Sequence, residues 1–134
     1  VRGDIAPIVI GKNSNIQDGA VIHCDVDVPC TIEEGVTVGH GAIIHSATVG
    51  NNTVVGMGAI ILGKAKIGED SIVGAGALVT GGKTFPPRSM IFGNLAKRIR
   101  DLTDDEIKAN RENARHYIVK AAEAENDYQD VKKE

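Results

Sequence analysis

The sequence predicts an all-β solenoid, a stack of coils built from very short strands, followed by one C-terminal α-helix. Aliphatic residues recur every six positions along most of the chain. This period fits neither a helix, with about 3.6 residues per turn, nor a sandwich, whose turns come roughly every 8–12 residues. Glycine is abundant, at 16 of 134 residues, and Trp is absent, so tight turns and a narrow core without large rings are expected.

The hexapeptide repeat defines the expected solenoid domain, residues 1–100. Its aliphatic positions are Ile10, Ile16, Ile22, Ile32, Val38, Ile44, Val49, Val55, Ile61, Ile67, Val73 and Val79, with Phe85 and Ile91 continuing the count less regularly. Each aliphatic side chain is expected to point into the core, and the residue after it is often the Gly of a turn. Three hexads make one triangular coil, and successive coils pair through backbone hydrogen bonds about 4.8 Å apart.

The second unit, residues 101–134, is predicted to be a helix and a short tail. Thr103 and Glu106 have the spacing of a capping box and flank two further acidic residues. The sequence therefore predicts a helix from 103 to about 128, which covers the open end or the side of the solenoid. Its expected apolar stripe consists of Ile107, Ala114, Ile118 and Ala121.

Composition narrows the choice of partners and compartment. The formal net charge of -3 argues against a nucleic acid or an anionic membrane as partner. No apolar run approaches the roughly 20 residues of a membrane span. The chain starts at Val1 without Met and without the pattern of a signal peptide, which indicates a trimmed or fragmentary N-terminus. Two cysteines are too few for a disulfide scaffold, so we predict a cytoplasmic protein.

Two histidines occupy the repeat position that Gly fills elsewhere. His23 follows Ile22 and His45 follows Ile44, 22 residues further along. One coil takes 18 residues, so this gap predicts one coil plus four residues looped out within 25–29. His23 and His45 are then expected to stack directly, one coil apart, and to face the same way.

A third histidine, His40, falls in a different repeat position and on a different face of the triangle. A neighbouring chain could bring it to His23 and His45, which predicts a symmetric oligomer, with a homotrimer suited to a triangular prism. Three imidazoles that leave one coordination position open are typical of a catalytic zinc site. The alternative is three unrelated surface histidines, but the one-coil spacing of two of them favours a metal site.

Polar residues surround the predicted site. Gln17 also occupies the Gly position, one hexad before His23, and Asp18 follows it. Arg2 and Asp4 could form an ion pair at the subunit interface. The alternatives are a simple turn residue for Asp18 and a solvated charge for Arg2.

These residues resemble a known family over essentially the whole chain. Arg2-Gly3-Asp4, the stretch 15–19 (Asn-Ile-Gln-Asp-Gly), and the placing of His23, His40 and His45 are similar to the gamma-class carbonic anhydrases. The resemblance implies a homotrimer of left-handed parallel β-helices, whereas the general rule for β crossovers would predict the opposite hand. It also implies Zn²⁺, or Fe²⁺ or Co²⁺, between subunits.

The activity that the resemblance implies is the reversible hydration of carbon dioxide to bicarbonate by a metal-bound hydroxide. His23, His40 and His45 would be the metal ligands. The other implied site residues are Gln17 on the hydroxide, Asn15 shaping the pocket, Arg2 and Asp18 as an interface ion pair supported by Asp4, and Tyr117 approaching from the helix.

The sequence lacks two residues that transfer the proton to solvent in the archetype of that family. Ile5 stands in the place of one shuttle glutamate, and the segment 24–30 is shorter than the acidic loop that carries a second one. The acidic residues that could substitute are Asp25, Asp27, Glu33 and Glu34. A metal site is therefore a safer prediction than rapid hydration.

Two other functions remain open at this stage. Hexapeptide acyltransferases and thioesterases acting on acyl-CoA share this fold and typically use one histidine as a general base, without metal. A catalytically weak structural homologue is the third possibility, and fold alone cannot decide among them. Cys24 and Cys30 are free thiols, an oxidisable pair or accidental; zinc ligation by Cys24 conflicts with strand alternation next to His23.

Overall fold

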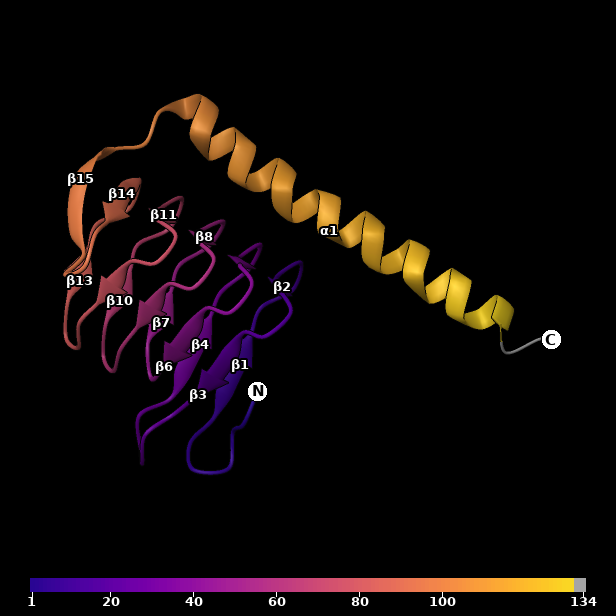
Figure 1. The fold of residues 1–134 in the computed structure, drawn as a ribbon, viewed down its shortest axis with the longest axis horizontal. Coiled ribbons are helices and arrows are strands. Elements are labelled where there is room, and N and C mark those ends of the chain that lie inside the picture. Colours follow the sequence, from indigo (N-terminus) through magenta and orange to yellow (C-terminus); the bar gives the residue numbers. More distant parts are fainter. Residues whose placement is uncertain (132–134) are drawn as a thin grey trace.

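The computed structural model describes residues 1–131, with side chains described through residue 128. Coils of three short strands stack into a parallel solenoid whose strands form three sheets, here named A, B and C (Figure 1). Sheet A contains β3 (Val21–His23), β6 (Ile43–His45), β9 (Ile60–Ile61) and β12 (Leu78–Val79). Sheet B contains β1 (Ile8–Ile10), β4 (Cys30–Ile32), β7 (Thr48–Val49), β10 (Lys66–Ile67) and β13 (Thr84–Phe85). Sheet C contains β2 (Asn15–Ile16), β5 (Thr37–Val38), β8 (Val54–Val55), β11 (Ile72–Val73), β14 (Ser89–Phe92) and β15 (Lys97–Asp101).

The predicted solenoid with a C-terminal helix is confirmed. Each strand pairs in parallel with the equivalent strand of the next coil, as β4 does with β7 and β8 with β11. The exception is β15, which turns back and pairs antiparallel with β14, at the C-terminal end of sheet C. The left-handed sense of the winding is what the family resemblance implies.

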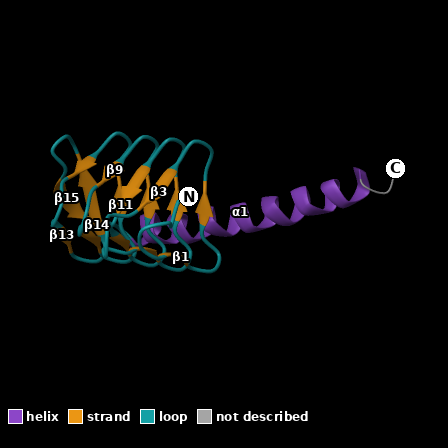
Figure 2. Cartoon of the chain, turned by 90° about the horizontal axis from the view of Figure 1, so that it is seen from below, coloured by secondary structure: helices purple, strands orange, loops and turns teal. Residues whose placement is uncertain are grey.

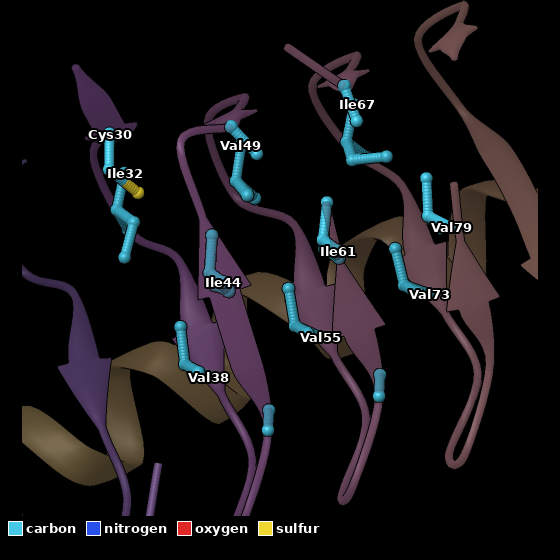
Figure 3. Close-up of a cluster of buried hydrophobic side chains, with 14 of the residues drawn as sticks. Cys30, Ile32, Val38, Ile44, Val49, Val55, Ile61, Ile67, Val73 and Val79 are labelled. Carbon is cyan, nitrogen blue, oxygen red and sulfur yellow. The ribbon is translucent and has the colours of Figure 1, made fainter. Parts of the chain in front are cut away.

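The core is a set of aliphatic ladders that run through the coils (Figure 3). All of the repeat positions from Ile22 to Val79 are buried, with exposed fractions of 2% or less. At the N-terminal end, Ile10 is 39% exposed and Ile16 half-buried, because no coil stacks on the outer side of β1 and β2 in the described chain. The repeat therefore predicts the core correctly, and burial is weaker only in the first coil.

Helix α1 (Asp104–Val131) begins at the predicted capping box. The Glu106 backbone N–H donates to Thr103 Oγ1 at 3.2 Å, and the Thr103 N–H donates to Glu106 Oε2 at 2.9 Å. The helix packs on the outer face of sheet C, where the Asn110 amide donates to the backbone oxygen of Ser71 at 3.1 Å. It also forms an ion pair at its side, between Arg111 and Asp70, at 2.9 Å.

The distal half of α1 extends past the first coil of the solenoid (Figures 1 and 2). Ile107 and Ala114 are buried, as the stripe predicts, but Ile118 is 42% exposed and Ala121 is also exposed. The predicted stripe is therefore buried only in the first half of the helix; Ile118 lies at the margin of the solenoid, where it lines a hollow with Asn13 and Glu34. The helix also continues past residue 128, and residues 132–134 of the predicted tail lie outside the described residues. Within residues 1–131, no helix is both long and apolar enough to cross a membrane.

Candidate functional site

His23 and His45 stack at one edge of sheet A. The register pairs Val21 with Ile43, Ile22 with Ile44, and His23 with His45. Their ring centres lie 5.5 Å apart with an interplanar angle of 64°. The predicted one-coil stacking is confirmed. The loop between β3 and β4 spans residues 24–29, which includes the predicted segment 25–29, and a bridge between Asp25 and Val28 closes it.

Both rings have an acceptor on the Nδ1 side. His23 Nδ1 lies 2.6 Å from the backbone oxygen of Arg2, which can only accept, so Nδ1 carries the proton and donates it there. His45 Nδ1 lies 3.6 Å from Asp25 Oδ2, within ion-pair range and just beyond hydrogen-bond distance. The hydrogen bond from His23 Nδ1 fixes that ring and its tautomer, which leaves the Nε2 of His23 unprotonated and available to a metal. The prediction singled out Arg2 for its charge, and the structure adds its carbonyl group.

The donor chemistry of this pair fits a zinc-type ion. Two imidazoles bound through Nε2 to one tetrahedral zinc have ring centres about 5 Å apart, because each Zn–N bond is roughly 2.0–2.1 Å. The observed separation of 5.5 Å is close to this value. Neutral imidazole nitrogen suits Zn²⁺, Fe²⁺ and Co²⁺ alike. His23 and His45 can therefore supply two of the ligands that such an ion needs.

His40 lies at the opposite edge of sheet A. It follows β5 in the turn that leads into β6, whereas His45 ends β6. Within residues 1–131, no cluster of three or more His, Cys, Asp or Glu side chains could hold a metal. One chain therefore places the predicted ligands in two groups, His23 with His45 and His40 alone, on the two edges of one sheet.

A hollow of about 340 Å³ lies beside His40, between the solenoid and α1. Besides His40, its lining includes Gln17 from the end of β2, Met57 from the coil after His40, and Asn113 and Tyr117 from the helix. Tyr117 also makes an edge contact with the His116 ring, at 5.9 Å between ring centres. The structure thus brings Gln17, His40 and Tyr117 together, while Arg2 and Asp4 lie with His23.

Side-chain hydrogen bonds from the neighbouring strands β2 and β5 hold the Gln17 amide in place. Its Nε2 donates to Asn15 Oδ1 at 3.2 Å, and Asn15 Nδ2 donates to Thr37 Oγ1 at 3.0 Å. Asn113 Nδ2 approaches the same hydroxyl at 3.4 Å. Thr37 was not predicted as a site residue, although it is the register partner of Asn15, and counting 22 residues, as between His23 and His45, would have found it.

Arg2 pairs with Asp4 rather than with Asp18 inside this chain. The Arg2 Nη1 to Asp4 Oδ2 distance is 2.7 Å, and the hydrogen bond from Arg2 lowers the pKa of Asp4 below its usual value. Both side chains are more than half exposed, which makes this pair a weak contributor to stability in a single chain. Asp18 is exposed in the turn after β2, so the predicted pair with Arg2 would need a second chain.

The two cysteines lie at the base of the 24–29 loop. Cys24 and Cys30 are both free and buried, and the Cys24 thiol lies 3.6 Å from the backbone oxygen of Pro7. Burial raises the pKa of the Cys30 thiol, which disfavours the reactive thiolate. Cys24 points into the core, because successive residues along a strand face opposite sides and His23 points outward. The Cys24 thiol therefore lies on the opposite side of the strand from the His23 and His45 rings.

Comparison with known proteins decides the family. "Carbonic anhydrase" of Geobacillus kaustophilus is 48% identical over 120 residues, which make up 90% of this chain and 66% of that protein. "Probable carbonic anhydrase" of Methanocaldococcus jannaschii is 49% identical over 118 residues, 88% of this chain and 74% of that protein. The chain belongs to the gamma-carbonic anhydrase-like family of hexapeptide-repeat proteins.

The family is also evident in the repeat and in a solved structure. Residues 46–81 match the family described as bacterial transferase hexapeptide (six repeats). A crystal structure of a hexapeptide transferase family protein from Anaplasma phagocytophilum superposes with a TM-score of 0.84 and 39% identity. That match covers 88% of this chain and 69% of the other. Carbonic anhydrases and proteins named as transferases therefore share this scaffold, and the chemistry has to be argued from the site.

Proposed function

We propose that this protein hydrates carbon dioxide reversibly to bicarbonate at a metal site shared between subunits. One observation carries the proposal: two imidazoles stack at 5.5 Å, each with an oxygen atom on its Nδ1 side, while the third imidazole lies on the opposite edge of the same sheet. A hydrolytic or acyl-transfer site with one histidine as base needs no such stacked pair. Three converging imidazoles are the ligand set of a catalytic zinc site.

The outer face of sheet A supports assembly through that sheet. Its outward side chains are apolar along all four strands: Val21, Ile43, Ile60 and Leu78. Val21 is 48% exposed, and helix α1 covers sheet C instead. This apolar face lies between two proposed half-sites, one with His23 and His45 and one with His40, and is the surface expected to be buried when subunits meet. Repeating a head-to-tail contact around a threefold axis closes a homotrimer with three equivalent sites.

In the proposed site, His23 and His45 of one subunit and His40 of the next would hold the ion, with Zn²⁺ the expected species and Fe²⁺ or Co²⁺ the alternatives. When bound, such an ion makes hydroxide available near neutral pH, because it lowers the pKa of water to about 7. The hydrogen bond from His23 Nδ1 to the Arg2 backbone oxygen keeps that ring in the tautomer that presents Nε2, and the Asp25 carboxylate lies on the Nδ1 side of His45.

Gln17 is proposed to orient the reacting oxygen atoms. Its Nε2 is engaged by Asn15, which itself bonds to Thr37, so the amide is held in one orientation beside His40. A pre-oriented polar group contributes to catalysis because it needs no reorganisation during the reaction. Tyr117 closes the helix side of the same hollow and limits the access of bulk water. Arg2 and Asp18 are proposed to pair across the interface, with Asp4 beside them.

Proton export is proposed to depend on buffer. Ile5 carries no ionisable group, and it is 44% exposed where the archetype of the family has a glutamate. Without a dedicated carrier, the proton released in each cycle passes to solvent species. We therefore expect the turnover rate to rise with buffer concentration over a wider range than in an enzyme with its own proton shuttle.

A second candidate, acyl transfer, is favoured by the hollow at His40 and by relatives named as transferases. Two measurements separate the candidates: divalent metal content of the purified protein, and stopped-flow hydration of carbon dioxide, each with His40→Ala as control. We expect stoichiometric metal and hydration above background, both lost in His40→Ala. A metal-free protein that consumes acetyl-CoA with an acceptor would establish the second candidate instead.

A further inference from the structure

The 24–29 loop is clamped to the coil that carries His45. It interrupts the repeat between β3 and β4, and its bridge joins Asp25 to Val28. The hydroxyl of Ser46 accepts a hydrogen bond from the Asp25 backbone N–H at 2.6 Å and donates one to the Val28 oxygen at 3.1 Å. Ser46 is 2% exposed and directly follows His45. The loop is therefore anchored at its base by one buried side chain.

This anchor directs the Asp25 carboxylate over His45. Asp25 Oδ2 lies 3.6 Å from His45 Nδ1. The same oxygen reaches the next coil, where a Cβ placed on Gly63 would lie 3.5 Å from it. His23 Nδ1 has the backbone oxygen of Arg2 at 2.6 Å, with the Asp4 carboxylate further away at 3.9 Å, so the two rings differ in which group is nearest to Nδ1.

We propose that Asp25 is a positioning residue for His45. Its carboxylate accepts a hydrogen bond from Nδ1–H, which keeps the proton on Nδ1 and leaves Nε2 free and correctly oriented. Ser46 sets the place of the carboxylate by clamping the loop. The role of His45 as a metal ligand rests on the proposed function, whereas the effect of Asp25 on the ring does not. Metal-binding histidines commonly donate their second N–H to a carboxylate, and loss of that partner typically costs about 10–100-fold in metal affinity.

The first test is the tautomer of His45 in the metal-free protein, read by nitrogen-15 NMR at a pH where the imidazole is neutral. Asp25→Ala removes the acceptor. Asp27→Asn removes one charge from the same loop at a position with φ of 57°, which Asn tolerates, and is the matched control. We expect Asp25→Ala to shift the tautomer ratio of His45 towards Nε2–H by about tenfold or more, the effect of losing a hydrogen bond to a charged group.

His23 should not respond to Asp25→Ala, Asp27→Asn should leave His45 unchanged, and Asp25→Glu should restore part of the wild-type ratio. Ser46→Ala should shift His45 in the same direction as Asp25→Ala but by less, because the carboxylate remains on a freed loop. An unchanged His45 tautomer in Asp25→Ala would overturn the proposal, whether or not the protein binds metal.

The second test is competition for Co²⁺ against a chromophoric chelator. We expect Asp25→Ala to weaken binding by about 10-fold or more and Asp27→Asn by less than about twofold. Equal affinities for the wild type and Asp25→Ala would contradict the role of Asp25 in the metal site. If the wild type binds no Co²⁺, Zn²⁺ or Fe²⁺, the proposed function is contradicted instead. The NMR result would still decide whether Asp25 controls the tautomer of His45.

Discussion

Sheets A and B are built from the same repeat and differ in what they present outward. Inward, both place fully buried aliphatic residues, such as Ile44 in sheet A and Val49 in sheet B. Outward, sheet A has the apolar ladder Val21, Ile43, Ile60 and Leu78. The outward ladder of sheet B, after Val9 in the first coil, is Thr31, Thr48, Lys66 and Thr84. Inward residues thus specify the fold, and outward residues distinguish the face that we propose to be buried between subunits.

The histidines of the strands also distinguish sheet A from sheet B. His23 and His45 end two strands of sheet A, and His40 precedes one of them, while sheet B has no histidine on its strands. In the proposed assembly, burying the apolar face of sheet A would gain hydrophobic free energy and complete the ligand set at the same time, whereas burying the polar face of sheet B would do neither.

The largest expected effect separates the two outer faces. Ile60→Glu places a charge in the middle of the sheet A ladder, whereas Thr48→Glu places the same charge on sheet B. A carboxylate buried without a partner costs several kcal/mol, so we expect Ile60→Glu to dissociate the proposed trimer and to abolish the proposed metal binding. Thr48→Glu should remain trimeric. Light scattering after gel filtration measures both, and a trimeric Ile60→Glu would break the comparison.

The next effect separates a central coil from the first coil at the same inward position. Ile61→Ala leaves a cavity where the side chain is fully buried, and we expect a loss of about 2–5 kcal/mol in the free energy of unfolding. Ile10→Ala, at a site already 39% exposed, should cost less than about 1 kcal/mol. Urea denaturation at one protein concentration tests both variants, and equal losses would show that the first coil is as well packed as the rest.

A smaller effect is expected from the hydrogen bonds beneath Gln17. Thr37→Val removes the hydroxyl that receives Asn15 and Asn113 while keeping the shape of the side chain. Loss of one such contact is worth about 1–1.5 kcal/mol, so we expect kcat/KM for hydration to fall about tenfold. Thr31→Val, on the outer face of sheet B, is the control and should keep full activity. A Thr37→Val enzyme as active as the control would remove this network from the account.

The smallest effect concerns the helix start, away from sheet A. Hydrogen bonds from Arg100 and from the Thr103 backbone lower the pKa of Glu106 to about 2. Because the pKa is depressed in the folded state, the stabilisation is complete above the ordinary value of 4.5 and is lost as the pH falls towards 2. Glu106→Gln should therefore have a flatter stability profile across that range, measured by thermal denaturation. A wild-type profile in Glu106→Gln would contradict the shift.

The sequence predicts the regular part of this molecule well and the irregular part poorly. Counting hexads gives the register of His23 and His45, because each strand repeats at a fixed interval. The same count does not specify the shape of the 24–29 loop, so the contact between Asp25 and His45 was not foreseen. The exposure of Ile118 was missed for a related reason: the helical pattern gives a face but not the length of the sheet beneath it.

Contacts made by backbone groups were also not predicted from the sequence. Arg2 was selected for its guanidinium group, yet its carbonyl oxygen is the group that meets His23. Every residue has a carbonyl group, so no sequence pattern distinguishes that acceptor from any other. The capping box, by contrast, was predicted correctly because both of its hydrogen bonds depend on side chains at fixed spacing, Thr103 and Glu106.

The claim that one metal site needs two chains has a direct measurement. His23→Ala and His40→Ala chains are each purified, shown to lack bound metal, then mixed and refolded together, and their Co²⁺ content is determined. Sites that combine His45 and an intact His23 with an intact His40 from the other variant should reappear, at roughly a quarter of the wild-type content for random threefold mixing. Mixed trimers that bind no more metal than either parent would contradict the account.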